Sequence, residues 1–164
     1  MNLLIRKVIL RPLILMVLGS YVLLLSGCTR LMLFVVINRS DRPIEVRYKI
    51  KQSPSDILLV CDPPAVMMAS QLGTEQHWQE LSDAQYKLDH DKRLLTMSLK
   101  AGEALRIIVI HTPQNEQDEL TEAQRFCVEQ IELRGDYGDI GFQGRQSYYG
   151  FKSEAGELRA INYK

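Results

Sequence analysis

The fold of this chain is indicated most clearly by residues 44–51, which read IEVRYKIK. Four apolar residues alternate there with four charged ones. This period of two predicts a β-strand with one face in a core and one face in water, because successive side chains of a strand point to opposite faces. The stretch follows NRSDRP at residues 38–43, which is typical of a turn.

Upstream of that turn, residues 31–37 form the apolar run LMLFVVI. The run is too short to span a membrane and is rich in β-branched residues, so it predicts a strand buried on both faces. We expect residues 31–37 and 44–51 to form a first hairpin. Similar short runs bounded by turn signals recur downstream, at residues 57–61, 86–88, 94–99, 105–110, 126–133, 140–142, 148–151 and 158–163.

A series of short strands without alternating helices favours an all-β fold. We expect a single antiparallel β-sandwich, immunoglobulin/transthyretin-like, over residues 31–164. Residues 65–84 are expected to hold a short helix or a loop. In a helical turn within residues 74–81, Trp78 and Leu81 would lie on the same side. If the segment is a long loop, Trp78 would fix that loop to the core. Residues 113–124 are acidic and predict a loop or a short helix.

The first 27 residues have the three-part build of a secretory signal peptide. Arg6, Lys7 and Arg11 give a basic start, and residues 13–25 form an apolar core. A membrane span needs about 20 apolar residues, so this core fits a signal peptide better than a transmembrane helix. An uncleaved anchor helix is the alternative.

The apolar core ends in Leu25-Ser26-Gly27-Cys28, which resembles the lipobox of bacterial lipoproteins. The resemblance implies that the Cys28 thiol is diacylglycerated, that the chain is cut between Gly27 and Cys28, and that the new amino group is acylated. Several buried acyl chains anchor a protein stably, whereas a single chain binds a membrane only marginally.

The lipobox divides the chain into a signal peptide at 1–27, an acylated anchor and tether at 28–30, and the sandwich. Thr29 stands where an Asp would resemble an inner-membrane retention signal, so we expect the protein on the outer membrane, at its periplasmic face. The tether is too short to reach far, because extended chain spans about 3.5 Å per residue. The domain is therefore expected to lie close to the bilayer.

Removal of the signal peptide leaves 137 of the 164 residues, which is enough for one domain. This part carries all 20 acidic residues and 17 of the 20 basic ones, for a net charge of about −3. A mildly acidic, mixed surface lacks the basic footprint of nucleic-acid-binding proteins. We therefore expect no nucleic-acid partner.

Cys61 and Cys127 are the other two cysteines. A chain exported beyond the inner membrane enters an oxidising compartment, where two thiols of a small domain tend to pair. We expect a disulfide between them, with two buried free thiols as the alternative. A redox site is not expected, because the sequence has no C-x-x-C motif.

His77, His90 and His111 are the histidines that a metal site could use. Asp89-His90-Asp91 is more typical of a solvated turn, because neighbours on a strand alternate faces and a metal site needs converging ligands. The sequence also lacks the motifs of nucleophile elbows, phosphate-binding loops and zinc proteases. We expect no metal, no cofactor and no catalytic residue, and so a protein that is not an enzyme.

Tyr148-Tyr149-Gly150-Phe151, with Tyr137 upstream, is the cluster that we interpret as a candidate partner surface. On a strand, Tyr148 and Gly150 would share one face, and Tyr149 and Phe151 the other. One face could then present a tyrosine to a partner, since interfaces favour tyrosine. Packing in the core or at a strand edge is the alternative.

The sequence PIEVRY at residues 43–48 resembles an early strand of the small β-sandwich lipoproteins of type VI secretion systems. We expect a non-catalytic binding or assembly accessory in a cell-envelope complex, with a protein partner close to the bilayer. Two alternatives stay open. One is a ligand-binding or hydrolytic domain with a pocket near residues 62–84, and the other is a structural lipoprotein exposed at the cell surface.

Overall fold

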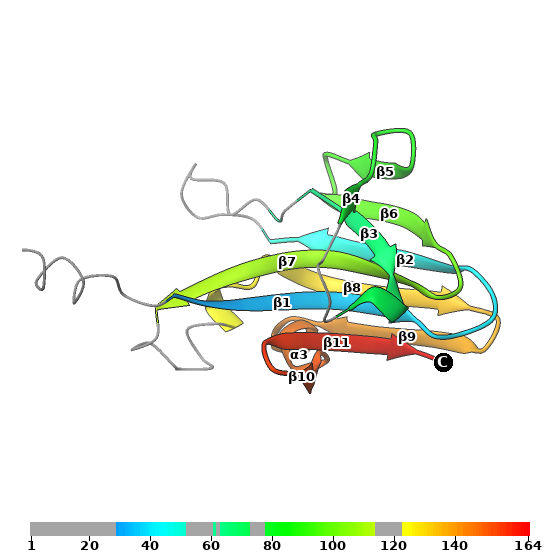
Figure 1. Cartoon of the computed structure of the whole chain (residues 1–164). Helices are drawn as coiled ribbons and strands as arrows, with labels where there is room; N and C mark the ends of the chain where they lie inside the picture. Colours follow the sequence, from blue (N-terminus) through cyan, green and yellow to red (C-terminus); the bar gives the residue numbers. More distant parts are fainter. Residues whose placement is uncertain (1–28, 52–60, 62, 73–77, 114–122) are drawn as a thin grey trace, which may run out of the picture.

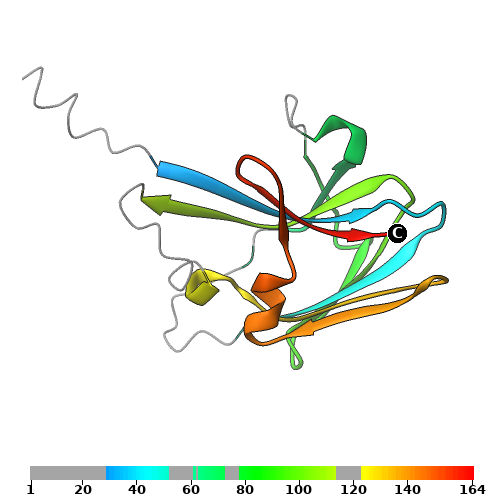
Figure 2. The ribbon, with the colours of Figure 1, turned by 90° about the horizontal axis from the view of Figure 1, so that it is seen from below.

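The computed structural model describes residues 29–51, 61, 63–72, 78–113 and 123–164. Two β-sheets pack face to face, which confirms the all-β sandwich (Figures 1 and 2). Sheet A has the order β10-β11-β1-β7-β3-β4 and sheet B the order β5-β6-β2-β8-β9. The strands of sheet A are β1 (Thr29–Asn38), β3 (Ala65–Met68), β4 (Gln79–Glu80), β7 (Glu103–Pro113), β10 (Lys152–Ala155) and β11 (Leu158–Tyr163). Those of sheet B are β2 (Ile44–Ile50), β5 (Tyr86–Asp89), β6 (Leu94–Leu99), β8 (Val128–Gly135) and β9 (Gly138–Gln143).

The first hairpin predicted from the sequence is wrong, because β1 and β2 lie in different sheets. β1 pairs with β7 and β11, whereas β2 pairs with β6 and β8. The burial patterns explain the difference. β1 is buried on both faces, as predicted, so other residues must pack against both of its faces. β2 keeps one face in water. The connection at residues 39–43 therefore crosses from one sheet to the other.

The buried Asn38 fixes this crossing. Its side-chain amide donates hydrogen bonds to the carbonyls of Arg42, at 2.8 Å, and of Leu99, at 3.0 Å. Its Oδ1 accepts hydrogen bonds from the main-chain N–H and the hydroxyl of Ser40. Asn38 has no exposed surface, so these bonds replace those that the amide would make with water.

One strand pair departs from the antiparallel arrangement that the sequence predicts. β11 runs parallel to β1, in register from Leu33 opposite Leu158 to Asn38 opposite Tyr163. A parallel pair cannot be joined by a tight turn, and here nearly the whole domain lies between the two strands. Local turn signals therefore carry no information about this pairing.

The strand predicted at residues 148–151 is also wrong. Arg145–Tyr149 forms a short helix, α3, that begins after Gly144, which has a φ of 60°. Tyr148 and Phe151 lie three residues apart and both rings pack against Phe34, with centroids 5.5 and 5.4 Å away. Burial of these two aromatic rings on one side favours the helical turn over an extended strand.

The main core fills the space between the sheets, and a smaller core lies on the outer face of sheet A. Trp78 and the 3-10 helix η1 (Ala69–Gln71) pack against the smaller core. For residues 65–84 the sequence left a short helix or a loop open, and the segment contains the short helix η1 together with β3 and β4. Of the two alternatives for residues 74–81, the helical turn is wrong at Gln79–Glu80, which is strand. The predictions for residues 1–28, 57–60, 73–77 and 114–122 fall outside the described residues.

Candidate functional site

The end of the sandwich nearest the N-terminus is a two-stranded ribbon. β1 begins at Thr29, directly after Cys28, and pairs with the end of β7: Thr29 lies opposite Pro113, and Leu31 opposite His111. β11 joins β1 only from Leu33 onward, so β1 and β7 extend past it, as Figure 2 shows. The residues expected to form a tether after Cys28 are therefore the first residues of a paired strand.

A disulfide joins Cys61 and Cys127, the pair predicted from the sequence, with their Cα atoms 5.6 Å apart. Both cysteines are buried in the main core. Cys127 directly precedes β8 of sheet B, and Cys61 precedes β3 of sheet A. The disulfide therefore links the segment that leads into β8 of sheet B to the segment that leads into β3 of sheet A.

The histidines in the described part of the chain lie apart. His90 is exposed in the turn between β5 and β6, and His111 is exposed on the ribbon, whereas His77 lies outside the described residues. Asp89 accepts a hydrogen bond from the main-chain N–H of Lys92, which lowers the pKa of its carboxyl group. Within the described ranges no group of three His, Cys, Asp or Glu side chains is placed to hold a metal ion.

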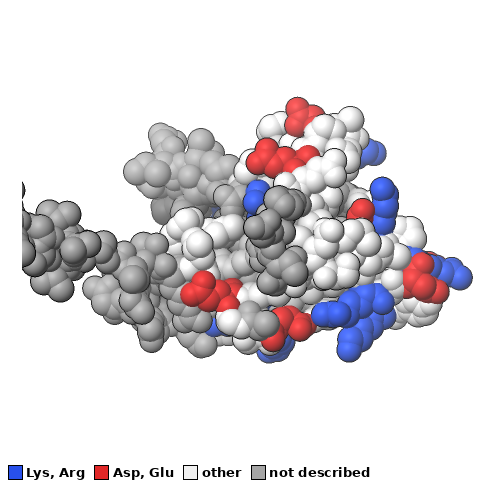
Figure 3. All heavy atoms as spheres, viewed as in Figure 1, with Lys and Arg blue, Asp and Glu red and all other residues white. Residues whose placement is uncertain are grey.

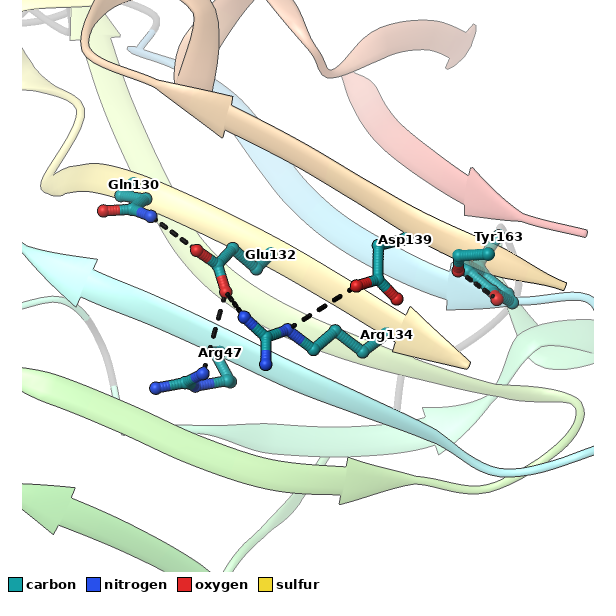
Figure 4. Close-up of polar contacts among 7 residues, drawn as sticks. Arg47, Gln130, Glu132, Arg134, Asp139 and Tyr163 are labelled. Atoms are coloured by element: carbon teal, nitrogen blue, oxygen red, sulfur yellow. Dashed lines mark hydrogen bonds and ion pairs between the residues drawn. The ribbon is translucent and has the colours of Figure 1, made fainter. Parts of the chain in front are cut away.

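The outer face of sheet B carries a network of charged side chains (Figure 4). Glu132 on β8 accepts hydrogen bonds from Arg134, at 2.8 Å, and from Gln130, at 2.6 Å, and it forms an ion pair with Arg47 on β2 at 3.8 Å. Beside it lies an open hollow of about 360 Å³ that extends to the turn before β6. Because these charges already neutralise one another, the network is best explained as a solvated sheet face.

The outer face of sheet A differs from that of sheet B. The smaller core gives its centre many apolar residues, and acidic and basic side chains lie around the rim of the part that Figure 3 does not draw in grey. Trp78 packs against the smaller core on this face, with the guanidinium of Arg106 5.7 Å from the ring centroid. Trp78 therefore covers part of the sheet, and it does not line the hollow beside Glu132, the one beside Tyr86 or the one beside Tyr149.

The three tyrosines predicted as a partner surface do not come together. Tyr148 is only 1% exposed and belongs to the core, which corrects its assignment to a surface. Tyr137 is 60% exposed in the turn before β9, where its hydroxyl donates to Asp41; this hydrogen bond to a carboxylate raises the pKa of Tyr137. Tyr149 is 43% exposed on α3, beyond the other end of β9. The six residues of β9 separate the two exposed tyrosines by about 20 Å.

Tyr149 sits at an open hollow of about 350 Å³ where α3 meets β9. The hollow is lined by Gly141, Phe142, Gln146, Tyr149, Gly150 and Lys152. A Cβ atom on Gly150 would lie 3.0 Å from the ring of Phe142, so the glycine allows the end of α3 to pack directly on β9. The result is a partly apolar site on a rigid support.

The sequence patterns did not reveal the role of β9. It is the last strand in the order of sheet B, and its one partner among the described strands is β8. A strand becomes an edge through long-range pairing, which short turn and strand signals do not encode. The scarcity of Lys and Pro in residues 138–143 was the available clue, because natural edge strands often carry them.

Comparison with family models, with curated proteins and with solved structures gives no match to this chain. Among the residues that the structure describes, no helix has the length and apolar character needed to cross a membrane.

Proposed function

We propose that this protein is a lipoprotein acylated at Cys28, and that it acts by binding, as an accessory or assembly factor in a cell-envelope complex. It lies on the periplasmic face of the outer membrane and carries out no catalysis. The observation that supports binding is the position of Tyr149, an exposed aromatic residue beside a hollow at the end of a free strand edge.

The membrane anchor is supported by the sequence before Thr29 and by the start of β1. The apolar run at 13–25 and the lipobox at 25–28 end where the paired strand begins. No loose chain separates the acylated cysteine from the sandwich, so the domain stays near the bilayer. A partner that docks on it must therefore be membrane-bound or reach the membrane surface.

The site at Tyr149 is held in place before any partner arrives. The buried hydroxyl of Ser147 lies 2.9 Å from the carbonyl oxygen of Glu129 and 3.2 Å from that of Phe142, which ties α3 to the β8–β9 hairpin. The ring of Tyr149 also packs edge-on against Tyr148, with centroids 5.1 Å apart. Binding at a site that is already ordered costs less conformational entropy than binding at a loose one.

Photocrosslinking in cells tests the proposal. A photoreactive residue replaces Tyr149 in the full chain, and the matched control replaces Leu88, which is 38% exposed on β5 at the opposite edge of sheet B. We expect a discrete protein adduct from position 149, in the membrane fraction, and none of the same mass from position 88. Adducts with lipid alone at position 149, or equal adducts at both positions, would contradict the binding function.

A further inference from the structure

The main-chain groups on the open side of β9 can be identified from one hydrogen bond. The N–H of Gly144 donates to the carbonyl of Glu129 at 2.7 Å, directly beyond the pair formed by Gln143 and Gln130. In an antiparallel ladder, alternate residues of a strand direct their N–H and C=O groups to the same neighbour. Residues 138, 140 and 142 therefore bond to β8, whereas Asp139, Gly141 and Gln143 direct these groups away from it.

These outward-directed groups meet no partner strand in the described part of the chain. β9 also lacks most of the features that usually protect an edge strand, and Asp139 is its one charged residue. It contains neither Lys nor Pro, and its register with β8 is continuous over six residue pairs. The other strands that stand last in a sheet order are shorter: β4 has two residues, β5 has four, and β10 has four with an irregular register against β11.

We propose that the partner docks by adding an extended segment to β9, with main-chain hydrogen bonds to Asp139, Gly141 and Gln143. An added strand uses the unpaired groups of a sheet edge for affinity and adjacent pockets for specificity. The pocket here is the hollow beside Phe142 and Tyr149, which takes an apolar side chain of the partner. This inference rests on the binding function proposed above and defines its partner as an extended segment of a protein.

The hollow also indicates that the occupant is a different protein and not the β9 strand of a second copy. The side chains that β9 directs to the outer face of sheet B are those of Asp139, which pairs with Arg134, and Gln143, since Ile140 and Phe142 pack against the main core. A second copy of β9 therefore has no apolar side chain to place in the hollow. Lys152 lines the hollow and forms no ion pair with any described carboxylate. A partner segment with an acidic residue next to its apolar residue would complement the positive charge of Lys152.

Two substitutions at one position separate docking through the main chain from docking through side chains. Gln143→Pro removes an N–H that points to the open side and leaves the bonds between β8 and β9 in place. Gln143→Ala removes the side chain and keeps the N–H. Both are introduced into the full chain that carries the photoreactive residue at position 149, and the yield of its adduct is measured in cells. Non-reducing electrophoresis checks that the Cys61–Cys127 disulfide has formed in each variant.

We expect Gln143→Pro to lower the adduct yield about tenfold and Gln143→Ala to lower it less than about twofold, because loss of a buried donor costs more than loss of an exposed side chain. An undiminished adduct in Gln143→Pro would overturn strand addition and leave the binding function standing. An adduct of twice the mass of this chain would identify a second copy and overturn the assignment to a different protein. Failure to form any adduct at position 149 would overturn both proposals.

Hydrogen exchange on the chain that carries only the photoreactive residue at position 149 gives a readout that does not depend on the fold of a Gln143 variant. The amides of Asp139, Gly141 and Gln143 exchange quickly in the free protein and slow at least about tenfold in the crosslinked complex, whereas those of Ile140 and Phe142 are slow in both. Unchanged exchange at the three outward amides in the complex would overturn the proposed strand addition.

Discussion

Replacement of Asn38 tests the account of how the chain crosses between the sheets. Asn38→Asp keeps the size of the side chain but removes both donors, so a carboxylate oxygen faces the carbonyls of Arg42 and Leu99. Asn38→Ala removes the whole group. A net hydrogen bond contributes about 1 kcal/mol, so the alanine variant is expected to lose about 2–3 kcal/mol of unfolding free energy. The aspartate variant is expected to lose about 4 kcal/mol at pH 7, because it also buries an unpaired charge.

The two Asn38 variants are distinguished by their dependence on pH. Burial next to two carbonyls raises the pKa of the new carboxyl group in the folded state above the value of about 3.9 in the unfolded chain. The added destabilisation is therefore present above the folded-state pKa and disappears as pH falls through it, when the protonated acid can donate to a carbonyl again. The alanine variant has no such dependence.

Thermal unfolding of the detergent-solubilised chain, followed by circular dichroism between pH 3 and pH 8, measures both effects. One kcal/mol shifts the Tm of a domain of this size by roughly 3–5 °C. Ser40→Ala is the control, because it removes a hydroxyl from the same network and leaves both Asn38 donors in place. Equal Tm values for Asn38→Asp and the unsubstituted protein at pH 7 would refute the role assigned to the Asn38 amide.

Three further predictions concern the support of α3, the disulfide and the anchor. Ser147→Ala should lower the unfolding free energy by about 1 kcal/mol in urea titrations, while the exposed Ser153→Ala changes it by less than about 0.5 kcal/mol; equal effects would show that the Ser147 hydroxyl does not hold the helix. Reduction of the Cys61–Cys127 bond, which closes a 66-residue separation, should cost up to about 4 kcal/mol, and a urea midpoint unaffected by reductant would argue against this. Cys28→Ser should abolish incorporation of labelled palmitate and leave residues 1–27 attached, and palmitate on the variant would place the acylation elsewhere.

The sequence predicts well which side chains of a strand are buried, because that can be read from the pattern of apolar residues within the strand itself. The alternation of residues 44–51 predicts one buried face, and β2 buries Ile44, Val46 and Tyr48. The apolar run at 31–37 predicts burial on both faces, and β1 is covered by both cores. Periodicity determines which side chains are buried, because it reflects the contacts of each residue with the layers above and below the strand.

The errors arose where long-range pairing decides the structure. The turn before β2 has the composition of a hairpin turn, but its flanking strands pair with β7 and β6, far along the chain. The run YYGF at 148–151 has the composition of a strand, yet burial of Tyr148 and Phe151 on Phe34 selects a helix. Of the predicted partner surface, Tyr149 is the residue retained at the proposed site, and the neighbouring edge of β9 follows from the order of sheet B.

The paired ribbon also decides where a flexible linker can be inserted. Thr29 pairs with Pro113, so an insertion after Thr29 would separate it from its own strand. An insertion between Cys28 and Thr29 keeps β1 intact and changes the distance from the membrane alone. Twenty Gly and Ser residues add a root-mean-square span of about 25 Å.

The most direct test of the account combines this linker with the photoreactive residue at position 149. The measurement is the yield of the protein adduct in membranes from cells that carry the chain with and without the linker. The account predicts a clear adduct in the original chain and a several-fold lower yield with the linker, because the domain no longer stays beside its partner at the bilayer. An equal yield from both chains would contradict a membrane-proximal partner.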